Sequence, residues 1–208
     1  MSRRIGFLGG TFDPIHMGHL IIAEQAYDQF DLDQVLLIPS GHSYLKDSRA
    51  QKVQPPEVRL KMTQLAASCH ECFAASDIEI KRSGNTYTYE TFRQMHEEDP
   101  EAEIFFIVGA DTICSIRTWR EPAEIFRQCT ILAAGRADQI SDQAMLEEIE
   151  ALIRDFGADI RPLQVPAIGI SSTDIRERAA QGRSIRYLVP EPVKRYIIET
   201  GIYNKNDA

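Results

Sequence analysis

Residues 4–30 read RIGFLGGTFDPIHMGHLIIAEQAYDQF, and their pattern is the clearest indication of the class of fold. Residues 4–8 are predicted to form a short strand that ends in Gly9 and Gly10. Apolar residues recur near helical spacing over residues 18–30, which predicts a helix. A strand that turns through glycines into a helix is typical of an α/β sheet, where ligands bind at the carboxyl ends of the strands.

The rest of the sequence continues this alternation. Strands are predicted at residues 35–39, 73–80, 104–108, 129–134 and 159–165, and helices at 55–66, 88–98 and 141–156 and from 171 and 190 or 191. Residues 40–54 are polar without periodicity and predict a mobile loop. The alternation predicts an α/β fold: one doubly wound, Rossmann-like parallel sheet with helices on both faces. Because no repeat or linker divides the sequence, we expect a single domain, residues 1–208, with a C-terminal helical part from about residue 171.

The composition is that of a globular protein: 208 residues, 43% hydrophobic and 26% charged. No apolar run approaches the ~18 residues that a membrane helix needs, and glycines come too early for a signal peptide, so we expect no membrane partner and a cytoplasmic location. The net charge of −8 disfavours nucleic acid as a partner. A phosphate ligand would therefore need a locally basic site.

The four cysteines do not form the disulfide framework of a small secreted protein. Cys69 and Cys72 have C-x-x-C spacing, which is compatible with a redox or zinc site. Since no second pair stands at ligand spacing, core or incidental cysteines are the favoured interpretation.

The turn after the first strand carries the residues for a phosphate site. Gly9 and Gly10 let the backbone approach a phosphate closely, and Gly18 lets the helix start press against a ligand or the sheet. His16 and His19 are three residues apart, so both project to one side of the helix start and can donate to a polyphosphate. The alternative is a pair of structural histidines. The spacing matches neither a Walker A loop nor a G-x-G-x-x-G turn.

A second candidate motif precedes a predicted helix near the C-terminus. Ser171 and Asp174 have the spacing of a capping box, which explains both residues locally. Local structure does not explain Arg176, whose guanidinium can reach a phosphate held at the same helix start.

These motifs resemble those of a known family. Residues 9–19 resemble the GGTFDPxHxGH signature of the nucleotidyltransferase superfamily, specifically the bacterial nicotinate mononucleotide adenylyltransferases, and residues 170–176 resemble its ISSTxIR motif. Residues 182–197 resemble the family's C-terminal GxxIxYLVPxxVxxYI pattern, so the likeness covers nearly the whole chain. It implies transfer of the adenylyl group of ATP to nicotinate mononucleotide, giving nicotinate adenine dinucleotide (deamido-NAD) and pyrophosphate in NAD biosynthesis.

The resemblance also implies the site residues. Those for ATP are Gly9, Gly10, Thr11, Phe12, His16, Gly18, His19, Asp111, Ile170, Ser172, Thr173 and Arg176. Those for nicotinate mononucleotide are Gly10, Thr11, Lys46, Thr88, Trp119, Arg120 and Arg136. The catalytic group is His16, His19, Lys46 and Arg176, with His19 as the contact in the transition state. Because the attacking phosphate is already anionic, no side-chain nucleophile is needed, and Mg²⁺ travels with the ATP phosphates without a protein metal site.

The loop of Lys46 departs from the family pattern. The family's loop often reads PPHK, whereas Leu45 stands here in place of its histidine. His42 is a candidate to compensate for that histidine.

In the family, a tryptophan stacks on the nicotinate ring, while a threonine and a main-chain N–H hold its carboxylate. The counterparts are Trp119, Thr88 and the N–H of Arg120. From the residues alone, a lone tryptophan is more often a core residue, although Arg117 and Arg120 make full burial of Trp119 awkward. Asp111 follows a buried strand and is placed to accept a ribose hydroxyl.

Three alternatives stay open. The first is a pantetheine-phosphate adenylyltransferase or a cytidylyl enzyme of the same fold, although pantetheine-phosphate adenylyltransferases usually have threonine where His16 stands. The second is a nucleotide-binding regulator without turnover. The third concerns assembly, because the sequence is compatible with a monomer and with a homo-oligomer.

Overall fold

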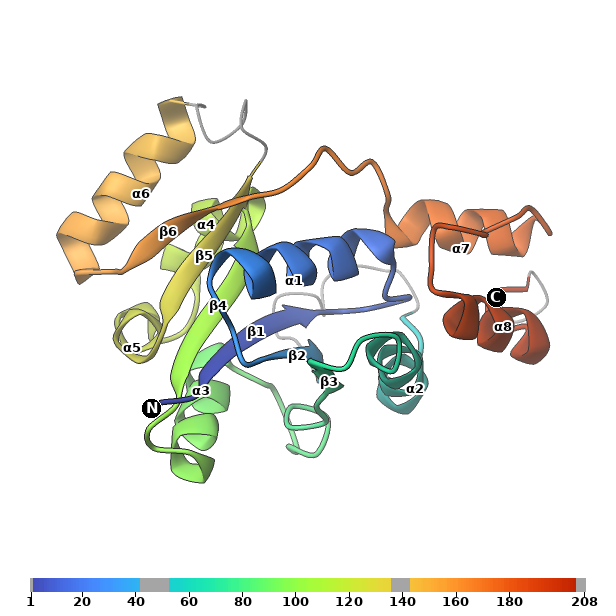
Figure 1. The fold of residues 1–208 in the computed structure, drawn as a ribbon, viewed down its shortest axis with the longest axis horizontal. Helices are drawn as coiled ribbons and strands as arrows, with labels where there is room; N and C mark the ends of the chain where they lie inside the picture. Colours follow the sequence, from blue (N-terminus) through green and yellow to red (C-terminus); the bar gives the residue numbers. More distant parts are fainter. Residues whose placement is uncertain (1, 42–52, 136–142, 205–208) are drawn as a thin grey trace.

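The computed structural model describes residues 2–41, 53–135 and 143–204 (Figure 1). Its strands are β1 (Arg4–Gly10), β2 (Gln34–Pro39), β3 (Phe73–Ala75), β4 (Glu103–Gly109), β5 (Thr130–Gly135) and β6 (Ile160–Gln164). They form one sheet in the order β3-β2-β1-β4-β5-β6, and every neighbouring pair is parallel. The predicted doubly wound parallel sheet is confirmed.

The strand order reverses between β1 and β4. The chain steps outward from β1 to β2 and β3, then crosses to the other side of β1 and continues outward through β4, β5 and β6. Ligands of open α/β sheets bind at this switch point, outside the carboxyl ends of the two strands. The glycine-rich turn and the start of the segment after β4 therefore lie where a site is expected.

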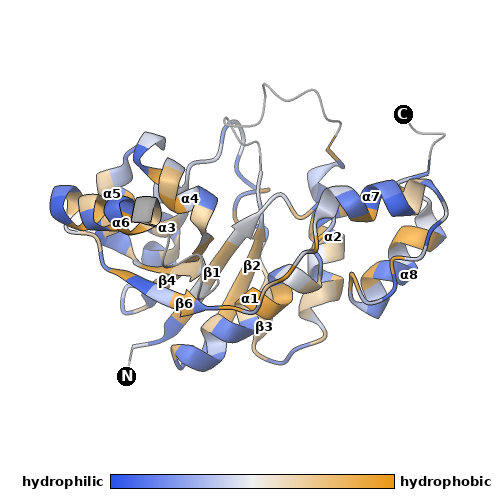
Figure 2. Ribbon diagram, turned by 90° about the horizontal axis from the view of Figure 1, so that it is seen from above, coloured by the Kyte–Doolittle hydropathy of each residue, from blue (hydrophilic) through white to orange (hydrophobic). Residues whose placement is uncertain are grey.

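Helices cover both faces of the sheet (Figures 1 and 2). They are α1 (Met17–Gln29), α2 (Pro56–Ala67), α3 (Thr88–Glu98), α4 (Ala110–Ser115), the 3₁₀ helix η1 (Ile116–Thr118), α5 (Pro122–Gln128), α6 (Gln143–Phe156), α7 (Ser172–Ala180) and α8 (Glu191–Thr200). Helices α1 and α2 share one buried cluster with α7 and α8, and α3 to α6 pack in a second cluster on the opposite face. None of the described helices combines the length and apolarity needed to cross a membrane.

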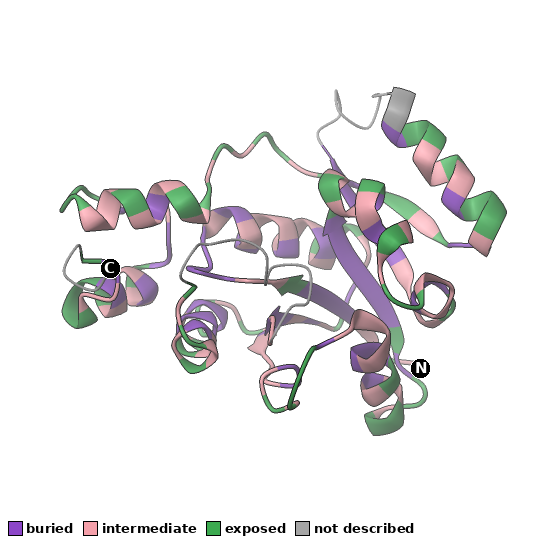
Figure 3. Ribbon diagram, turned by 180° about the vertical axis from the view of Figure 1, so that it is seen from behind, coloured by how far each residue is buried: buried purple, intermediate pink, exposed green. Residues whose placement is uncertain are grey.

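The central strands separate the two clusters because successive side chains point to opposite faces. Phe7 and Phe106 enter the cluster under α3, whereas Leu8 and Phe105 enter the one under α1. The rings of Phe7, Phe92 and Phe106 meet edge to face, with centroids 5.0 to 5.3 Å apart. The strands form the buried middle of the molecule (Figure 3).

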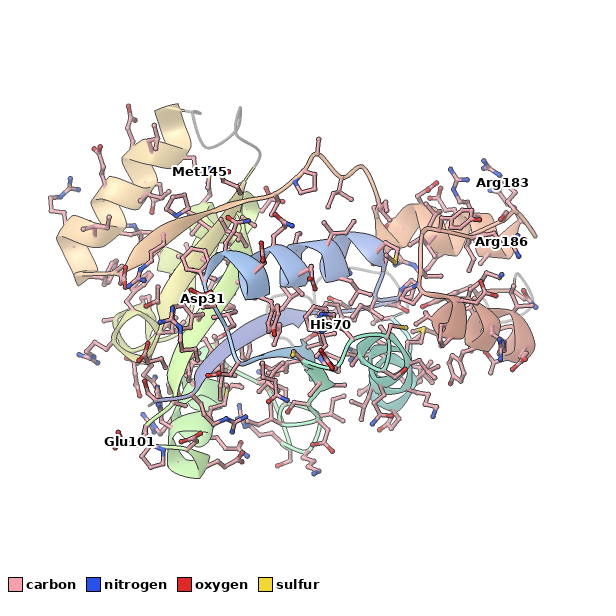
Figure 4. All side chains as sticks on the ribbon, viewed as in Figure 1. Asp31, His70, Glu101, Met145, Arg183 and Arg186 are labelled. Atoms are coloured by element: carbon pink, nitrogen blue, oxygen red, sulfur yellow. The ribbon has the colours of Figure 1, made fainter. Side chains whose placement is uncertain are left out.

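The C-terminal helices stand at one end of the molecule. In Figure 1, α7 and α8 lie one above the other beyond the tip of β1. Helix α8 packs against α2, and Met17 N–H donates to Leu188 O at 2.9 Å, which ties this part to the start of α1. Figure 4 shows Arg183 and Arg186, both exposed, at the outer edge of the same end.

Two predictions about elements are wrong. The strand predicted at residues 73–80 ends at Ala75, because the chain turns there: Lys81 N–H donates to Asp77 O at 2.9 Å. No element was predicted for α4, η1 and α5, which are too short to show a helical period. Of the helix predicted at 141–156, residues 141 and 142 lie outside the described residues, while α6 ends at Phe156, as predicted, before Gly157 with φ 66°.

Candidate functional site

A cavity of about 380 Å³ opens at the carboxyl ends of β1 and β4. Its wall comes from the glycine-rich turn, from α1, from the segment before α3 and from the segment after β4. The polar and aromatic residues among its lining, with the turn glycines, are Phe7, Gly9, Gly10, Thr11, His19, Ser40, Glu79, Thr86, Tyr87, Thr88, Phe106, Thr112, Trp119 and Arg120. The cavity thus brings together some of the residues predicted for each nucleotide: Gly9, Gly10, Thr11 and His19 for ATP, and Thr88, Trp119 and Arg120 for nicotinate mononucleotide.

The glycines of the turn are required by close packing. A Cβ on Gly10 would lie 2.6 Å from the ring of Phe12, and one on Gly9 would lie 2.9 Å from the ring of Phe7. Phe12 is 2% exposed and adopts φ 50°, so its side chain is buried while the backbone reverses. Both glycines and Thr11 line the cavity as predicted.

The two histidines stand together at the start of α1. His16 is the residue before the helix, and its main-chain N–H donates to Nδ1 of His19 at 3.2 Å. Their rings are stacked with centroids 3.7 Å apart. His19 lines the cavity, while His16 is 7% exposed and lies behind it. The prediction that both project to one side is confirmed.

The pKa values of both histidines are low. Burial lowers the pKa of His16 to about 4. Burial, with a smaller effect of neighbouring His16, lowers the pKa of His19 to about 3, and its ring lies between His16 and Phe12. At neutral pH each imidazole is uncharged and carries one N–H. Since Nδ1 of His19 accepts a hydrogen bond, its proton is on Nε2.

The second motif reaches back to the first. Ser172 Oγ donates to Pro14 O at 2.9 Å, and Arg176 Nη1 donates to Asp13 O at 2.7 Å. Arg176 also donates to Thr173 Oγ1 at 3.2 Å. The start of α7 is capped by Ser171, whose side chain accepts from Asp174 N–H at 3.2 Å, as predicted. Two motifs far apart in the sequence therefore form one structural unit.

Gly18 and Ile170 complete this junction. A Cβ on Gly18 would lie 3.1 Å from the ring of His16 and 3.3 Å from Cγ2 of Ile168, so the helix start presses closely on its neighbours. Ile170 is half-buried and packs against the cluster under α1.

The opposite wall holds the residues predicted for the pyridine ring. Trp119 is half-buried: it lines the cavity and also packs against the second cluster, 6.3 Å from Phe106 between ring centroids. Thr88 is the first residue of α3 and lines the same space. The guanidinium of Arg120 lies 5.2 Å from the ring centroid of Tyr87. These three residues are brought together.

Other predicted residues are not brought into the cavity wall. Asp111 is exposed in the first turn of α4, next to lining residues Gly109 and Thr112, but is not itself part of the described lining. Lys46, His42 and Leu45 lie outside the described residues, as does Arg136. Their roles stay predictions.

Glu79 is a cavity residue that sequence reasoning missed. It is 8% exposed, accepts from Gly41 N–H at 3.3 Å and from Thr91 Oγ1 at 3.2 Å, and has a pKa raised by burial. A Cβ on Gly41 would lie 2.5 Å from the main-chain oxygen of Glu79. The one sequence signal for Glu79 is that an acidic residue stands between Ile78 and Ile80, in a segment where apolar residues alternate.

The C-x-x-C cysteines lie away from this wall. Cys69 is exposed, and Cys72 is half-buried with its Sγ 3.1 Å from Tyr27 Oη. Within residues 2–41, 53–135 and 143–204, no group of three His, Cys, Asp or Glu side chains is placed to hold a metal ion.

Comparison with known proteins identifies relatives over the full length. Residues 7–178 match the family model described as cytidylyltransferase-like. A protein of Lachnoclostridium phytofermentans named "probable nicotinate-nucleotide adenylyltransferase" is 40% identical over 201 residues, 97% of this chain and 99% of that protein. One of the same name from a Thermoanaerobacter species is 41% identical over 205 residues, covering 98% and 96%.

A solved structure has the same fold. It is the nicotinic acid mononucleotide adenylyltransferase of Plasmodium falciparum complexed with NaAD, which aligns with a TM-score of 0.77 at 19% identity. The alignment covers 97% of this chain and 98% of that one.

Proposed function

The chain belongs to the cytidylyltransferase-like family and, within it, to the nicotinate-nucleotide adenylyltransferases, and on that premise we propose that it transfers the adenylyl group of ATP to nicotinate mononucleotide. The products are nicotinate adenine dinucleotide and pyrophosphate, and the step belongs to NAD biosynthesis. The structural observation that supports it most is the junction of the two motifs, in which Ser172 donates to Pro14 O and Arg176 donates to Asp13 O.

The reaction is an in-line displacement. An oxygen of the mononucleotide 5′-phosphate attacks the α-phosphorus of ATP, and the bond to the β-phosphate oxygen breaks. The attacking oxygen is already anionic, so the protein has to align the two nucleotides and stabilise the developing charge. Neither task requires a covalent intermediate.

The histidine side of the cavity suits the triphosphate. His19 presents its Nε2–H as a neutral donor, and the N-terminal end of α1 adds a partial positive charge. A donor fixed in advance stabilises the charge that develops on the leaving pyrophosphate. In this proposal His16, Lys46 and Arg176 also hold phosphates, while Ile170, Ser172 and Thr173 bind the same nucleotide from α7.

The opposite wall suits the acceptor. Trp119 offers a flat surface that is partly exposed to the cavity, and Thr88 lies on the same wall. We propose that the nicotinate ring stacks on Trp119, and that Thr88 and the N–H of Arg120 hold its carboxylate. Arg136 is proposed to contact the phosphate of the acceptor, and Asp111 a ribose hydroxyl.

Mg²⁺ is proposed to enter with ATP. A hard cation prefers phosphate oxygens and water, and it screens the negative charge that would otherwise oppose the attack. A cytoplasmic location is also proposed; the free state of Cys69, Cys72, Cys114 and Cys129 fits a reducing compartment.

The test is pyrophosphate release by the purified protein with Mg²⁺. ATP is supplied with nicotinate mononucleotide, with nicotinamide mononucleotide or with pantetheine phosphate, and CTP replaces ATP in a parallel series. We expect the greatest kcat/KM with ATP and nicotinate mononucleotide. Preference for pantetheine phosphate or CTP would assign another transferase of this fold, and binding of ATP without pyrophosphate release from any pair would indicate a regulator.

A further inference from the structure

A buried polar cluster lies behind the glycine-rich turn. It consists of Asp13, Arg59 and Tyr203, which are 4%, 3% and 8% exposed. Asp13 belongs to the turn, Arg59 to α2 and Tyr203 to the segment after α8. None of the three lines the cavity described above. Burial of these polar and charged groups costs free energy unless they are paired, so the presence of the cluster needs an explanation.

Arg59 binds three main-chain oxygens with one guanidinium. Its Nη1 donates to Thr11 O at 2.8 Å, its Nη2 to Ser40 O at 2.8 Å and its Nε to Gln54 O at 3.0 Å. These oxygens belong to the turn, to the residue after β2 and to the residue two before α2. The planar fork of an arginine can span three such acceptors, whereas a lysine ammonium cannot match that geometry.

Asp13 is held by the other end of the chain. Its Oδ1 accepts from Tyr203 Oη at 2.6 Å, and its Oδ2 accepts from Gln54 N–H at 3.3 Å. Its negative charge opposes the lowering of the pKa of Arg59 by burial. The carboxylate and the guanidinium therefore hold the turn together through shared neighbours.

Carbonyl oxygens of the turn accept hydrogen bonds from side-chain donors. Thr11 O accepts from Arg59, Asp13 O from Arg176 and Pro14 O from Ser172. In a trans peptide the C=O of one residue and the N–H of the next point in opposite directions. Fixing Thr11 O on Arg59 therefore orients the N–H of Phe12 away from the buried cluster. Backbone N–H groups oriented in this way are what an anionic phosphate requires.

We propose that Arg59, supported by Asp13 and Tyr203, is a positioning residue of the phosphate site. It sets the orientation of the glycine-rich turn from behind and touches neither nucleotide. The inference rests on the proposed function, because it assigns the turn to the phosphates of ATP. Displacing a phosphate-binding turn by a fraction of an ångström weakens its contacts most in the transition state.

The experiment uses the full chain with Arg59→Lys and, separately, Tyr203→Phe. Each variant is checked by its melting temperature, and kcat and both KM values are measured at saturating Mg²⁺. We expect kcat to fall ~10-fold or more in Arg59→Lys and ~3-fold or more in Tyr203→Phe, with the KM for nicotinate mononucleotide changed less than ~3-fold. We expect this split because the described hydrogen bonds of Arg59 reach Thr11, Ser40 and Gln54, whereas Trp119 and Thr88, proposed for the nicotinate ring, are not among its partners.

Matched controls remove similar bonds elsewhere. Arg4→Lys loses the bond from Nη2 to Phe30 O, 2.9 Å long, at the amino end of β1. Tyr27→Phe loses a hydroxyl that lies 3.1 Å from Cys72 Sγ. Both controls should keep kcat within ~2-fold of wild type, since surrounding structure far from the site absorbs such changes.

Folded variants that melt lower but keep the wild-type kcat would show a purely structural role and overturn the inference. If Arg59→Lys does not fold, Tyr203→Phe decides, because it keeps the side-chain volume. If the wild type transfers no adenylyl group, the proposed function is wrong, and ATP binding is measured by calorimetry instead. ATP affinity weaker by ~5-fold or more in the variants would then support the positioning role, and equal affinity would overturn it.

Discussion

The imidazole rings of His16 and His19 stack with centroids 3.7 Å apart and planes inclined by 26°. Two cationic rings at that separation would repel each other, so the arrangement disfavours protonation of both histidines at once. Their pKa values of about 4 and about 3 keep both rings uncharged throughout the neutral range.

This relationship predicts a pH-dependent stability. The pKa of His16 is about 4 in the folded protein and 6.5 when unperturbed, so the unfolded chain binds its proton first as the pH falls. The contribution of His16 to stability is complete above about pH 6.5 and is lost progressively towards pH 4. At pH 5 the loss should be on the order of 2 kcal/mol. Urea unfolding at pH 7, 6 and 5 measures it against His16→Asn, which keeps a good residue at the helix start. Parallel curves for the two proteins would contradict the assigned pKa.

His19→Ala is expected to lower turnover by ~10²-fold or more without unfolding the protein, because the lost Nε2–H acts on charge that develops during the reaction. Steady-state kinetics and a melting curve give the answer. His96→Ala serves as the control, since the His96 ring contacts Gln128 O on the opposite side of the sheet. A folded His19→Ala protein with near-normal turnover would exclude the role.

Nicotinate mononucleotide should be preferred over nicotinamide mononucleotide by at least ~10-fold in kcat/KM. Thr88 and a main-chain N–H donate hydrogen bonds that suit a carboxylate. An amide would turn its NH₂ group towards one of these donors, and neither that donor nor the NH₂ group would then be paired. The two acceptors are compared at one fixed ATP concentration. Equal efficiencies would show that the acceptor wall is assigned wrongly.

Trp119 is the single tryptophan, so the tryptophan fluorescence of the protein reports on the surroundings of this side chain alone. Nicotinate mononucleotide should change that emission saturably, and ATP alone should change it less. Trp119→Ala should weaken acceptor binding by ~1–3 kcal/mol, as for stacked bases, while ATP affinity stays nearly constant. If Trp119 served the core alone, the variant would melt lower and lose both affinities together.

Gly41→Ala should destabilise the protein by about 1–3 kcal/mol, because the new methyl group would lie 2.5 Å from a main-chain oxygen of Glu79. Gly169→Ala is the matched control, since a Cβ there meets nothing within 4 Å. Chemical unfolding of the wild type and the two variants measures their free energies of unfolding. Equal stabilities of the two variants would contradict the close approach, since the lower backbone entropy of the unfolded chain acts alike in both and stabilises the folded state.

Elements with a strong local pattern could be predicted from the sequence. Residues 104–108 form a continuous apolar run because β4 is covered on both faces, and α3 has the predicted bounds, Thr88–Glu98. The strand from Phe73 was extended too far because an apolar alternation continues through the turn at Asp77. Periodicity alone cannot detect such a turn.

In the candidate site, too, residues with a local sequence pattern could be predicted and residues with long-range contacts could not. The His16/His19 pair could be predicted because both residues lie within one helical turn. Arg59 could not, because its acceptors lie up to 48 positions away and an arginine on an amphipathic helix is ordinarily solvated. Long-range pairing leaves no signal in the local sequence.

The hydrogen bond between Tyr203 and Asp13 spans 190 positions of the chain. During synthesis, Asp13 leaves the ribosome long before Tyr203 is translated, so its carboxylate meets this partner only after all six strands have been made. The hydrogen bonding of the glycine-rich turn is thus completed only after every strand of the sheet has been made. A nascent chain can therefore assemble its sheet early and still lack the hydrogen bond that holds the carboxylate of this turn.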